Sequence, residues 1–429
     1  MKFKAFGFNR SANLLLAAIF IYGIVYNIWG LFLNLFVLSN HFNKEFLGIA
    51  NMVPAIAALV FGIPLGMMSD KIGRKRAILL GLAGSAFSTG LMAISDTAGM
   101  ILLSSFLWGV GTTLFTISQA PFLMKISDEN SRLTLFSLNS SLQIVAGVFG
   151  NLFAGQIPGI AADWLNISEV SPAAYQAVFF ISTVVGFLAI IPILFIHKDQ
   201  QRVIPSTIKP VEGLIENPAE FSLKLLITPE VIKLSLPYMI IGAGAGILIP
   251  YMNVFYMERF GLGNRELGIL FSLSALITGI GIMSGPRLAN WLGSKIKVVV
   301  FTQGASLIFM MLAGFSPVMG LSVIGFLMRG MLMNISPPIW SAFCMEQTSP
   351  SQQGAVNSFL NLTWTAGWLA GPFISGVIQE RYGFSPLFIG TFFLYSVSIL
   401  LTWIFFHNSE LKRKSTGAGD LFILVKENE

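Results

Sequence analysis

Twelve long apolar runs constrain the fold of this 429-residue chain more than any other feature of its sequence. Because an α-helix rises about 1.5 Å per residue, roughly 20 apolar residues are enough to cross the ~30 Å hydrocarbon core of a bilayer. Hydrophobic residues make up 54% of the chain and charged residues 11%, a composition that excludes an ordinary soluble domain. We therefore predict an all-α integral membrane protein with twelve transmembrane helices, at residues 12–38, 46–68, 77–95, 100–124, 135–157, 176–196, 233–256, 267–289, 298–316, 318–344, 355–377 and 385–406.

Signals for cleavage, disulfides and metal binding are weak in this sequence. The first run is too long for the apolar core of a secretory signal, so we expect it to be retained as a transmembrane helix. Cys344 is the one cysteine of the chain, which excludes an intramolecular disulfide. The three histidines, His41, His197 and His407, fall at the ends of runs or in loops. We predict no metal site, no catalytic centre and no cofactor.

The net charge of +6 is explained by membrane topology. If residue 1 is cytoplasmic, the N-terminus and alternate loops hold 21 of the 26 lysines and arginines, whereas the opposite side holds four. The remaining cation, Arg329, falls inside a run. Cytoplasmic loops are enriched in lysine and arginine, so we expect both termini to lie in the cytoplasm. The charge calls for no nucleic-acid partner.

The longest polar interruption, residues 197–232, divides the runs into two sets of six. The predicted organisation is a six-helix bundle at 1–196, a cytoplasmic loop at 197–232, a second six-helix bundle at 233–406 and a cytoplasmic tail at 407–429. Within the loop, the amphipathic piece 221–226 is expected at the membrane surface.

The two sets of six runs resemble copies of each other at an offset of about 220 residues. Gly23 and Asn34 correspond to Gly242 and Asn253, and Gly73 corresponds to Gly293. Three glycines of the fifth run correspond in the same order to three of the eleventh: Gly147, Gly150 and Gly155 to Gly367, Gly371 and Gly376. The alternative is twelve unrelated helices with chance glycines. Duplication is favoured by the shared order, and two similar bundles about a central site are typical of a transporter.

The loop between the second and third runs carries a motif with a specific resemblance. Gly66, Asp70, Lys71, Gly73, Arg74 and Lys75 resemble the loop signature G-x-x-x-D-[RK]-x-G-[RK]-[RK] of the major facilitator superfamily. The resemblance implies two pseudo-symmetric six-helix bundles. It also implies that this loop is a conformational latch, whose cations pair with acids below the fourth span. The candidate acids are Asp128 and Glu129, and Arg132 is a candidate for the same network. For Lys75 and Arg76, a simple positive-inside turn explains the sequence equally well.

Two features depart from the patterns of that family. Ser105 stands before Gly109, where many members carry an arginine. Asn151 stands in the fifth run where the antiporter signature has proline, and the clearer Gly-Pro pair is in the eleventh run. These two departures weaken the assignment of the chain to the proton-coupled drug exporters of the family. The candidate helix-packing or hinge residues are Gly147, Gly150, Gly155, Gly367, Gly371 and Pro372.

Polar side chains inside the apolar runs point to a solute pathway, because they are costly in hydrocarbon unless they face protein or water. When the first two and last two residues of each run are omitted, runs one, four, seven and ten carry five amides, whereas runs three, six, nine and twelve carry only Gln303. In the resembling family the first set lines the central cavity and the second packs outside. Asn27 and Asn34 share one helix face, which either lines a cavity or seats another helix. The predicted cavity amides are Asn27, Asn34, Gln119, Asn253, Asn334 and Asn361.

Arg329 is the most informative single residue, because it lies near the middle of the tenth run. A charge there costs at least about 2.5 kcal/mol on insertion scales, so it is expected to face the water-accessible interior. It either braces the bundle or attracts an anionic or strongly polar group of a solute. Trp340, Trp364 and Trp368 could add flat apolar walls or serve as packing.

The predicted function is a secondary active or facilitative transporter of a small organic solute, working by alternating access in the inner membrane of a bacterial or archaeal cell as a monomer. Export is weakly favoured over uptake of a sugar or organic anion. No P-loop is present, so direct ATP drive is not supported, and no span has a carboxylate in its core to carry a coupling proton. Three alternatives stay open: transport is coupled through Glu346, it is driven by solute exchange, or it is not coupled. An intramembrane enzyme lacks a suitable acidic or histidine cluster. A non-transporting receptor of the same fold stays open.

Overall fold

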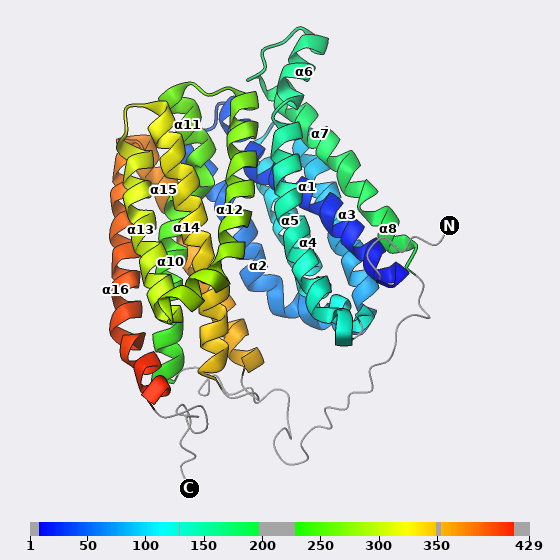
Figure 1. The fold of residues 1–429 in the computed structure, drawn as a ribbon. Coiled ribbons are helices and arrows are strands. Elements are labelled where there is room, and N and C mark those ends of the chain that lie inside the picture. The colour runs from blue at the N-terminus through cyan, green and yellow to red at the C-terminus, as the bar shows by residue number, and fades with distance from the viewer. Residues whose placement is uncertain (1–7, 128, 197–227, 349–352, 416–429) are drawn as a thin grey trace. The chain divides into compact units, whose positions relative to one another are not determined.

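Helices make up all the secondary structure in the part of the chain that the computed structural model describes, residues 8–127, 129–196, 228–348 and 353–415 (Figure 1). Eleven helical segments in these ranges are long and apolar enough to cross a membrane. The predicted span at 355–377 lies in a further helix, α15, which is 30 residues long. The predicted all-α membrane fold is confirmed.

The described residues form two compact units. Unit 1 holds those between 8 and 196 together with 250–276, and unit 2 holds 228–249 and those between 277 and 415. The helices of unit 1 are α1 (Arg10–Ser39), α2 (Lys44–Ile72), α3 (Arg74–Ala93), α4 (Ala98–Ile126), α5 (Glu129–Ala154), α6 (Ile157–Leu165), α7 (Pro172–Leu188), α8 (Ile190–Leu194), α11 (Met252–Phe260) and the start of α12 (Asn264–Leu292). Those of unit 2 are the rest of α12, α10 (Pro229–Leu248), α13 (Lys295–Phe315), α14 (Met319–Glu346), α15 (Gln353–Tyr382) and α16 (Ser385–Ser415).

Polar residues fix where many of these helices begin. The first amides of a helix have no partner within it, and a side-chain oxygen just before the helix can accept from one of them. Asn9, for example, accepts from the amide of Ala12 at 2.8 Å. The same geometry starts five more helices, at Asn43, Thr97, Ser171, Thr228 and Ser294.

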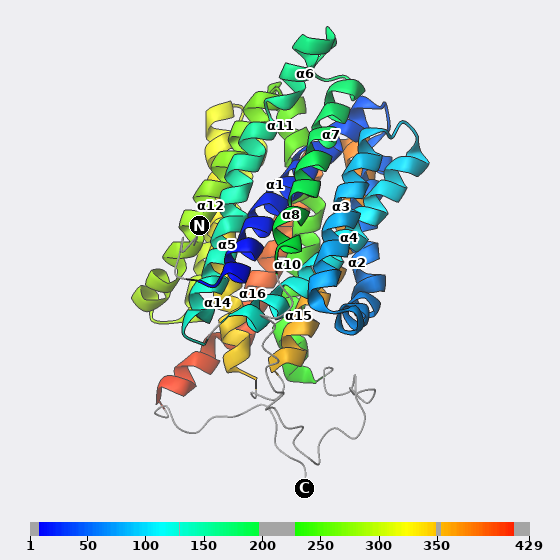
Figure 2. The same cartoon turned by 90° about the vertical axis from the view of Figure 1, so that its right-hand side faces the viewer.

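The same packing pattern occurs inside each unit. In unit 1, α1 lies against α5 and α7, and α3 lies against α4 and α7 (Figure 2). In unit 2, the helices at the corresponding positions repeat these pairs: α10 lies against α15 and α16, and α13 lies against α14 and α16. The recurrence of four helix pairs supports the duplication inferred from the sequence.

Backbone conformation repeats as well. His41 and Gly261 both have positive φ, at 61° and 66°, and stand 220 residues apart. Gly73 and Gly293, at 91° and 62°, stand the same distance apart. Positive φ is uncommon for residues other than glycine, so its recurrence at one offset marks corresponding turns. At Gly73 the turn separates α2 from α3 without a linker.

Three features of the helices were not predicted. The seventh span is broken: α10 and α11 are separated by a 3-10 turn, Ile249–Tyr251, because Pro250 has no amide hydrogen to continue the helix. The sixth span is divided into α7 and α8. A short helix, α6, occupies a predicted loop beyond the end of α7 (Figure 2). Trp164 on α6 is 85% exposed, which is typical of a tryptophan at a membrane interface.

The glycines predicted as packing or hinge residues lie at close helix contacts. An added Cβ at Gly150 would stand 3.2 Å from Ile24 of α1, and one at Gly155 would stand 2.8 Å from Gly268 of α12. At Gly147 the nearest atom is Oδ1 of Asn27, 3.1 Å away. In unit 2, Gly371 stands 2.5 Å from the backbone of Gly246 by the same measure. Small residues at such points let membrane helices approach backbone to backbone.

We predict that Gly367→Ala destabilises the protein by about 1–3 kcal/mol, the usual cost of overpacking. An added Cβ would overlap the carbonyl oxygen of Met239 and stand 3.0 Å from the nitrogen of Ala243. The measurement is the thermal midpoint of the detergent-purified chain. Gly304→Ala is the matched control, because nothing lies within 4 Å of that Cβ position in α13. Equal midpoints for the two variants would contradict the packing role.

Candidate functional site

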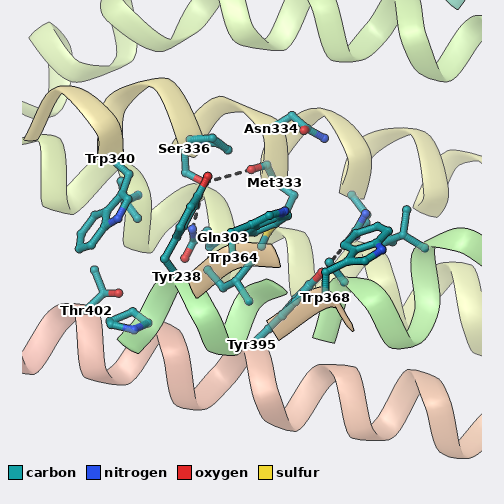
Figure 3. A pocket seen from close by; sticks show the side chains of 17 residues that line it. Tyr238, Gln303, Met333, Asn334, Ser336, Trp340, Trp364, Trp368, Tyr395 and Thr402 are labelled. Atoms are coloured by element: carbon teal, nitrogen blue, oxygen red, sulfur yellow. Dashed lines mark hydrogen bonds between the residues drawn. The ribbon is translucent and has the colours of Figure 1, made fainter. Parts of the chain in front are cut away.

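A cavity of about 140 Å³ lies among the helices of unit 2 (Figure 3). We call it the unit 2 cavity. Its walls come from α10, α13, α14, α15 and α16. The aromatic side chains that line it are Tyr238, Trp340, Trp364, Trp368 and Tyr395, and the polar side chains that line it are Gln303, Arg329, Asn334, Ser336 and Thr402. A mainly apolar cavity with a few polar groups is typical of a small-molecule site.

Three of the rings form a connected wall. The centroids of Tyr238 and Trp364 are 4.8 Å apart, and those of Trp364 and Trp368 are 6.3 Å apart with their planes 30° from parallel. Trp364 and Trp368 are four residues apart on α15 and therefore share a helix face. Ring faces of this kind suit a flat apolar ligand.

Arg329 supplies the positive charge of the unit 2 cavity. Its side chain is buried, with the whole residue 7% exposed, and its Nη2 donates a hydrogen bond to the hydroxyl of Tyr395 at 2.7 Å. Its guanidinium carbon lies 5.7 Å from the centre of the same ring. Among the described residues, Arg329 forms no ion pair with a carboxylate. Removing a charge from water costs several kcal/mol unless a partner compensates, so an anionic ligand would satisfy this site.

Three polar atoms of the cavity-lining residues are buried without a hydrogen-bond partner among the described residues. They are Nε of Arg329, Nε1 of Trp340 and Oε1 of Gln303. Buried polar atoms are nearly always hydrogen-bonded in folded proteins, and leaving one unsatisfied costs about 1–3 kcal/mol. Three of these unpartnered atoms thus belong to residues that line one cavity.

The structure divides the predicted cavity residues. Four of them line the unit 2 cavity: Arg329, Asn334, Trp340 and Trp364. Asn27 instead donates to the carbonyl of Gly23 in its own helix, and Gln119 donates to Asn139 at 2.5 Å. Asn361 is exposed and does not line this cavity. Asn34 and Asn253 bind each other.

Gln303 and Tyr395 line the unit 2 cavity although they lie on α13 and α16, the helices of the ninth and twelfth spans. The sequence analysis expected those spans to pack outside the pathway. The sequence did contain one indication of this. Gln303 is the single amide in the interiors of runs three, six, nine and twelve. Tyr395 gave no comparable signal, because tyrosine is common in apolar helices.

An amide cluster of Asn34, Asn51 and Asn253 joins α1, α2 and α11 within unit 1. Asn34 donates to the carbonyl of Pro250 at 2.5 Å and to Oδ1 of Asn253 at 2.9 Å. Asn253 donates in return to the carbonyl of Leu31 at 2.7 Å. Each asparagine thus bonds to the carbonyl three residues before the other. Both are 1% exposed, so the cluster holds the segment after the Pro250 break against α1.

Three further contacts fix the residues 250–276 to unit 1. The Tyr175 hydroxyl donates to Oδ1 of Asn264 at 3.1 Å, and Ser272 donates to the carbonyl of Val148 at 2.7 Å. Lys44 and Glu258 form an ion pair at 2.8 Å. Together with the Gly155 contact to α12, these bonds explain why this segment belongs to unit 1 although it follows α10 in the chain.

In the predicted latch, Asp70 forms an ion pair with Arg74 across the Gly73 turn. Arg74 also donates to Oγ of Ser69 at 3.1 Å. The ammonium of Lys75 donates to the carbonyl of Ile196, at the end of the first six spans, at 2.6 Å.

The structure describes the contacts of the remaining predicted latch residues only in part. Gly66 has ordinary packing, because an added Cβ would lie 3.8 Å from Ile117, and Lys71 is exposed. Arg132 donates to Ser127 at 3.3 Å. Glu129 begins α5, and Asp128 lies outside the described residues. The pairing of the loop cations with these two acids stays a prediction.

Two helical membrane units, one of which contains a cavity of about 140 Å³, are compatible with a solute carrier. The family model described as Major Facilitator Superfamily matches residues 14–372 and again residues 234–423. The chain belongs to the major facilitator superfamily. It is an integral membrane protein and a transporter rather than an enzyme, and its partners are a small-molecule solute and membrane lipid.

Individual relatives are distant. The chain is 25% identical to the multidrug resistance protein MdtG of Proteus mirabilis (strain HI4320), over 81% of this chain and 82% of that protein. It is 24% identical to the class B tetracycline resistance protein of Escherichia coli, over 86% and 87% of the two chains. Among solved structures, a bacterial homolog of the human lysosomal transporter Spinster, in an inward-facing and occupied conformation, superposes with a TM-score of 0.73 at 15% identity, over 91% of this chain and 96% of that one.

We predict that Asn34 and Asn253 are energetically coupled. Asn34→Leu and Asn253→Leu should each lower the unfolding free energy by about 1–3 kcal/mol, because each leaves buried carbonyl oxygens unpaired. Unfolding of the double variant should reveal a coupling of about 0.5–3 kcal/mol. Pairing Asn253→Leu with Asn27→Leu is the control and should be additive, because Asn27 bonds within its own helix. Additivity in both pairs would contradict the cluster.

We predict that Asp70→Asn reduces transport in proteoliposomes while changing the unfolding free energy by less than about 1 kcal/mol, because exposed ion pairs contribute little to stability. The Asp70 side chain is 65% exposed. Arg76→Gln is the control, since Arg76 is an exposed cation of the same turn. Transport at the wild-type rate in Asp70→Asn would remove the latch role.

Proposed function

We propose that the chain exports a small planar organic solute carrying an anionic or strongly polar group, by alternating access. The observation that carries the proposal is Arg329, a buried guanidinium without a carboxylate partner among the described residues, at a cavity walled by tryptophans. A ligand anion would compensate its charge, and ring stacking would hold the apolar part of the solute. The names of the relatives, multidrug and tetracycline resistance proteins, favour export.

The proposal extends to the transport cycle. Asp70, Gly73 and Arg74 act as a latch at one end of unit 1, and the amide cluster acts at the other end of α1. Both sets of contacts are present in the structure. In the proposed cycle, opening one end of the carrier breaks the set at that end, so a solute is exposed to one side of the membrane at a time. Gly150 and Gly371 serve the close helix packing that lets each bundle move as a body.

The proposal also covers location. The loop cations, among them Lys71 and Lys75, place that end of unit 1 in the cytoplasm by the positive-inside rule, with both chain termini on the same side. The bacterial relatives favour the cell membrane of a bacterium. The chain acts as a monomer, because the unit 2 cavity is formed by one copy alone.

We predict that Arg329→Gln abolishes stabilisation of the purified protein by organic anions. The screen groups organic anions, sugars and lipophilic cations, and the wild type should be stabilised by the anions. Loss of the guanidinium should weaken anion binding at least tenfold, or about 1.4 kcal/mol. Arg329→Lys should retain part of the affinity, because it keeps the charge and loses the planar fork.

The variant should fold normally. The substitution removes an uncompensated buried charge but also the hydrogen bond to the Tyr395 hydroxyl, so the unfolding free energy without ligand should fall by no more than the roughly 1–3 kcal/mol of one unsatisfied group. Lys233→Gln is the matched control, because it removes an exposed cation of α10 that does not line the cavity. If Arg329→Gln binds anions as tightly as the wild type, the proposal is wrong. Counterflow of a labelled anion then distinguishes a carrier from a protein that only binds the anion.

A further inference from the structure

The amide of Gln303 is held in one orientation at the wall of the unit 2 cavity. Its nitrogen, Nε2, lies 3.0 Å from Oγ of Ser336, and that Oγ lies 3.0 Å from the carbonyl oxygen of Met333 (Figure 3). In a regular helix the carbonyl of Met333 would accept from residue 337, but Pro337 has no amide hydrogen, so the Ser336 hydroxyl donates its single proton to that carbonyl. Ser336 then accepts from Gln303, which fixes Nε2 toward Ser336 and leaves Oε1 on the other side.

The oxygen of Gln303 is therefore an acceptor in need of a donor. It is buried and without a hydrogen-bond partner among the described residues, in a side chain only 5% exposed overall. The two other unpartnered atoms of the cavity residues, Nε of Arg329 and Nε1 of Trp340, are donors. The residues that line the cavity thus carry unsatisfied atoms of two kinds, and a purely anionic ligand could satisfy only the donors.

The three groups are spread along the cavity. Arg329, Ser336 and Trp340 lie on α14 at steps of seven and four residues, which places them on one helix face. At about 1.5 Å per residue, Ser336 is roughly 10 Å along the helix from Arg329, and Trp340 is roughly 6 Å farther. Gln303, bonded to Ser336, therefore meets the cavity between the other two. Figure 3 shows Trp340 and Trp368 at opposite ends of the cavity and Gln303 between them.

We propose that Gln303 selects solutes that carry an N–H or O–H donor on the planar ring, at a distance from the anionic group that Arg329 binds. The proposal rests on the proposed function, because it assigns the anionic end of the solute to Arg329. The chemical class is a hydroxylated or amino-substituted aromatic acid. A buried site built to accept a hydrogen bond discriminates strongly against an analogue that lacks the donor, because its own acceptor is then left unpaired.

The test compares two probes that share a carboxylate and a benzene ring, para-hydroxybenzoate and para-methoxybenzoate. The first has an O–H donor, and the second has only an acceptor at that position. Isothermal titration calorimetry on the detergent-purified full chain measures both. The wild type should bind para-hydroxybenzoate at least tenfold more tightly. Gln303→Met, which is similar in length but has no amide, should bind the two probes alike.

The chain offers a closely matched control in Gln379. This buried glutamine of α15 also donates its Nε2 to a serine, Ser375, at 2.7 Å, and its Oε1 also has no partner among the described residues. It does not line the unit 2 cavity. Gln379→Met should therefore keep the wild-type preference. Ser336→Ala is a second test that leaves Gln303 in place, and it should reduce the preference because the amide is then free to turn.

The outcomes separate the two proposals. If the wild type binds both probes equally, or if Gln303→Met and Ser336→Ala keep the full preference, Gln303 is not the selector. In that case, if Arg329→Gln no longer binds either probe, the anion site at Arg329 is still supported. If neither probe binds the wild type, or if Arg329→Gln binds both as before, the anion site fails and the role of Gln303 fails with it.

Discussion

The hydrocarbon core of a bilayer offers no hydrogen-bond partner, and the rest of this structure depends on that constraint. Every backbone polar group at membrane depth must be satisfied by the protein, so the described chain is helical throughout its spans. Where a helix breaks, another group must satisfy the freed atoms. The break at Pro250 frees a carbonyl, and Asn34 of α1 donates to it. The same rule makes the three unsatisfied atoms around the unit 2 cavity informative.

The two halves share one backbone plan, and the cavity that Arg329 lines lies in unit 2. At the offset of 220 residues that relates Gly73 to Gly293, Arg329 corresponds to Gly109. Gly109 packs so closely on α2 that an added Cβ would stand 2.6 Å from the carbonyl oxygen of Pro54. A long side chain could not be accommodated there. The absence of the family arginine at Ser105 in the fourth span and the presence of Arg329 in the tenth are consistent with a shift of the charged site to the second half.

The sequence predicted the fold far better than the site. Apolar length alone located the spans, because the physics that sets them is local: each must cover the membrane with its own residues. The α6 helix and the break at Pro250 were missed, since both depend on what packs beside them. Arg329 was found because a charge is rare in hydrocarbon. Gln303 was seen and set aside, because only its neighbours show that its oxygen lacks a partner.

The two asparagines show the same limit in a sharper form. Sequence alone placed Asn34 and Asn253 at corresponding positions of two halves and left open whether that face lined a cavity or seated another helix. Asn34 bonds to the carbonyl of Pro250, and Asn253 bonds to the carbonyl of Leu31. Two equivalent positions thus contact each other reciprocally, as the same residues of two subunits do in a two-fold symmetric dimer.

The strength of this amide cluster also suits a moving part. Four hydrogen bonds join Asn34, Asn51 and Asn253 to each other and to the two carbonyls, and each is worth about 1 kcal/mol net. Their sum is comparable to the ~5.5 kcal/mol of differential binding needed to move a two-state equilibrium from 1:99 to 99:1. A much larger contact would lock the segment 250–276 onto α1, and a much smaller one would not hold it. In the proposed cycle, solute binding therefore acts against an interaction small enough to be broken and remade.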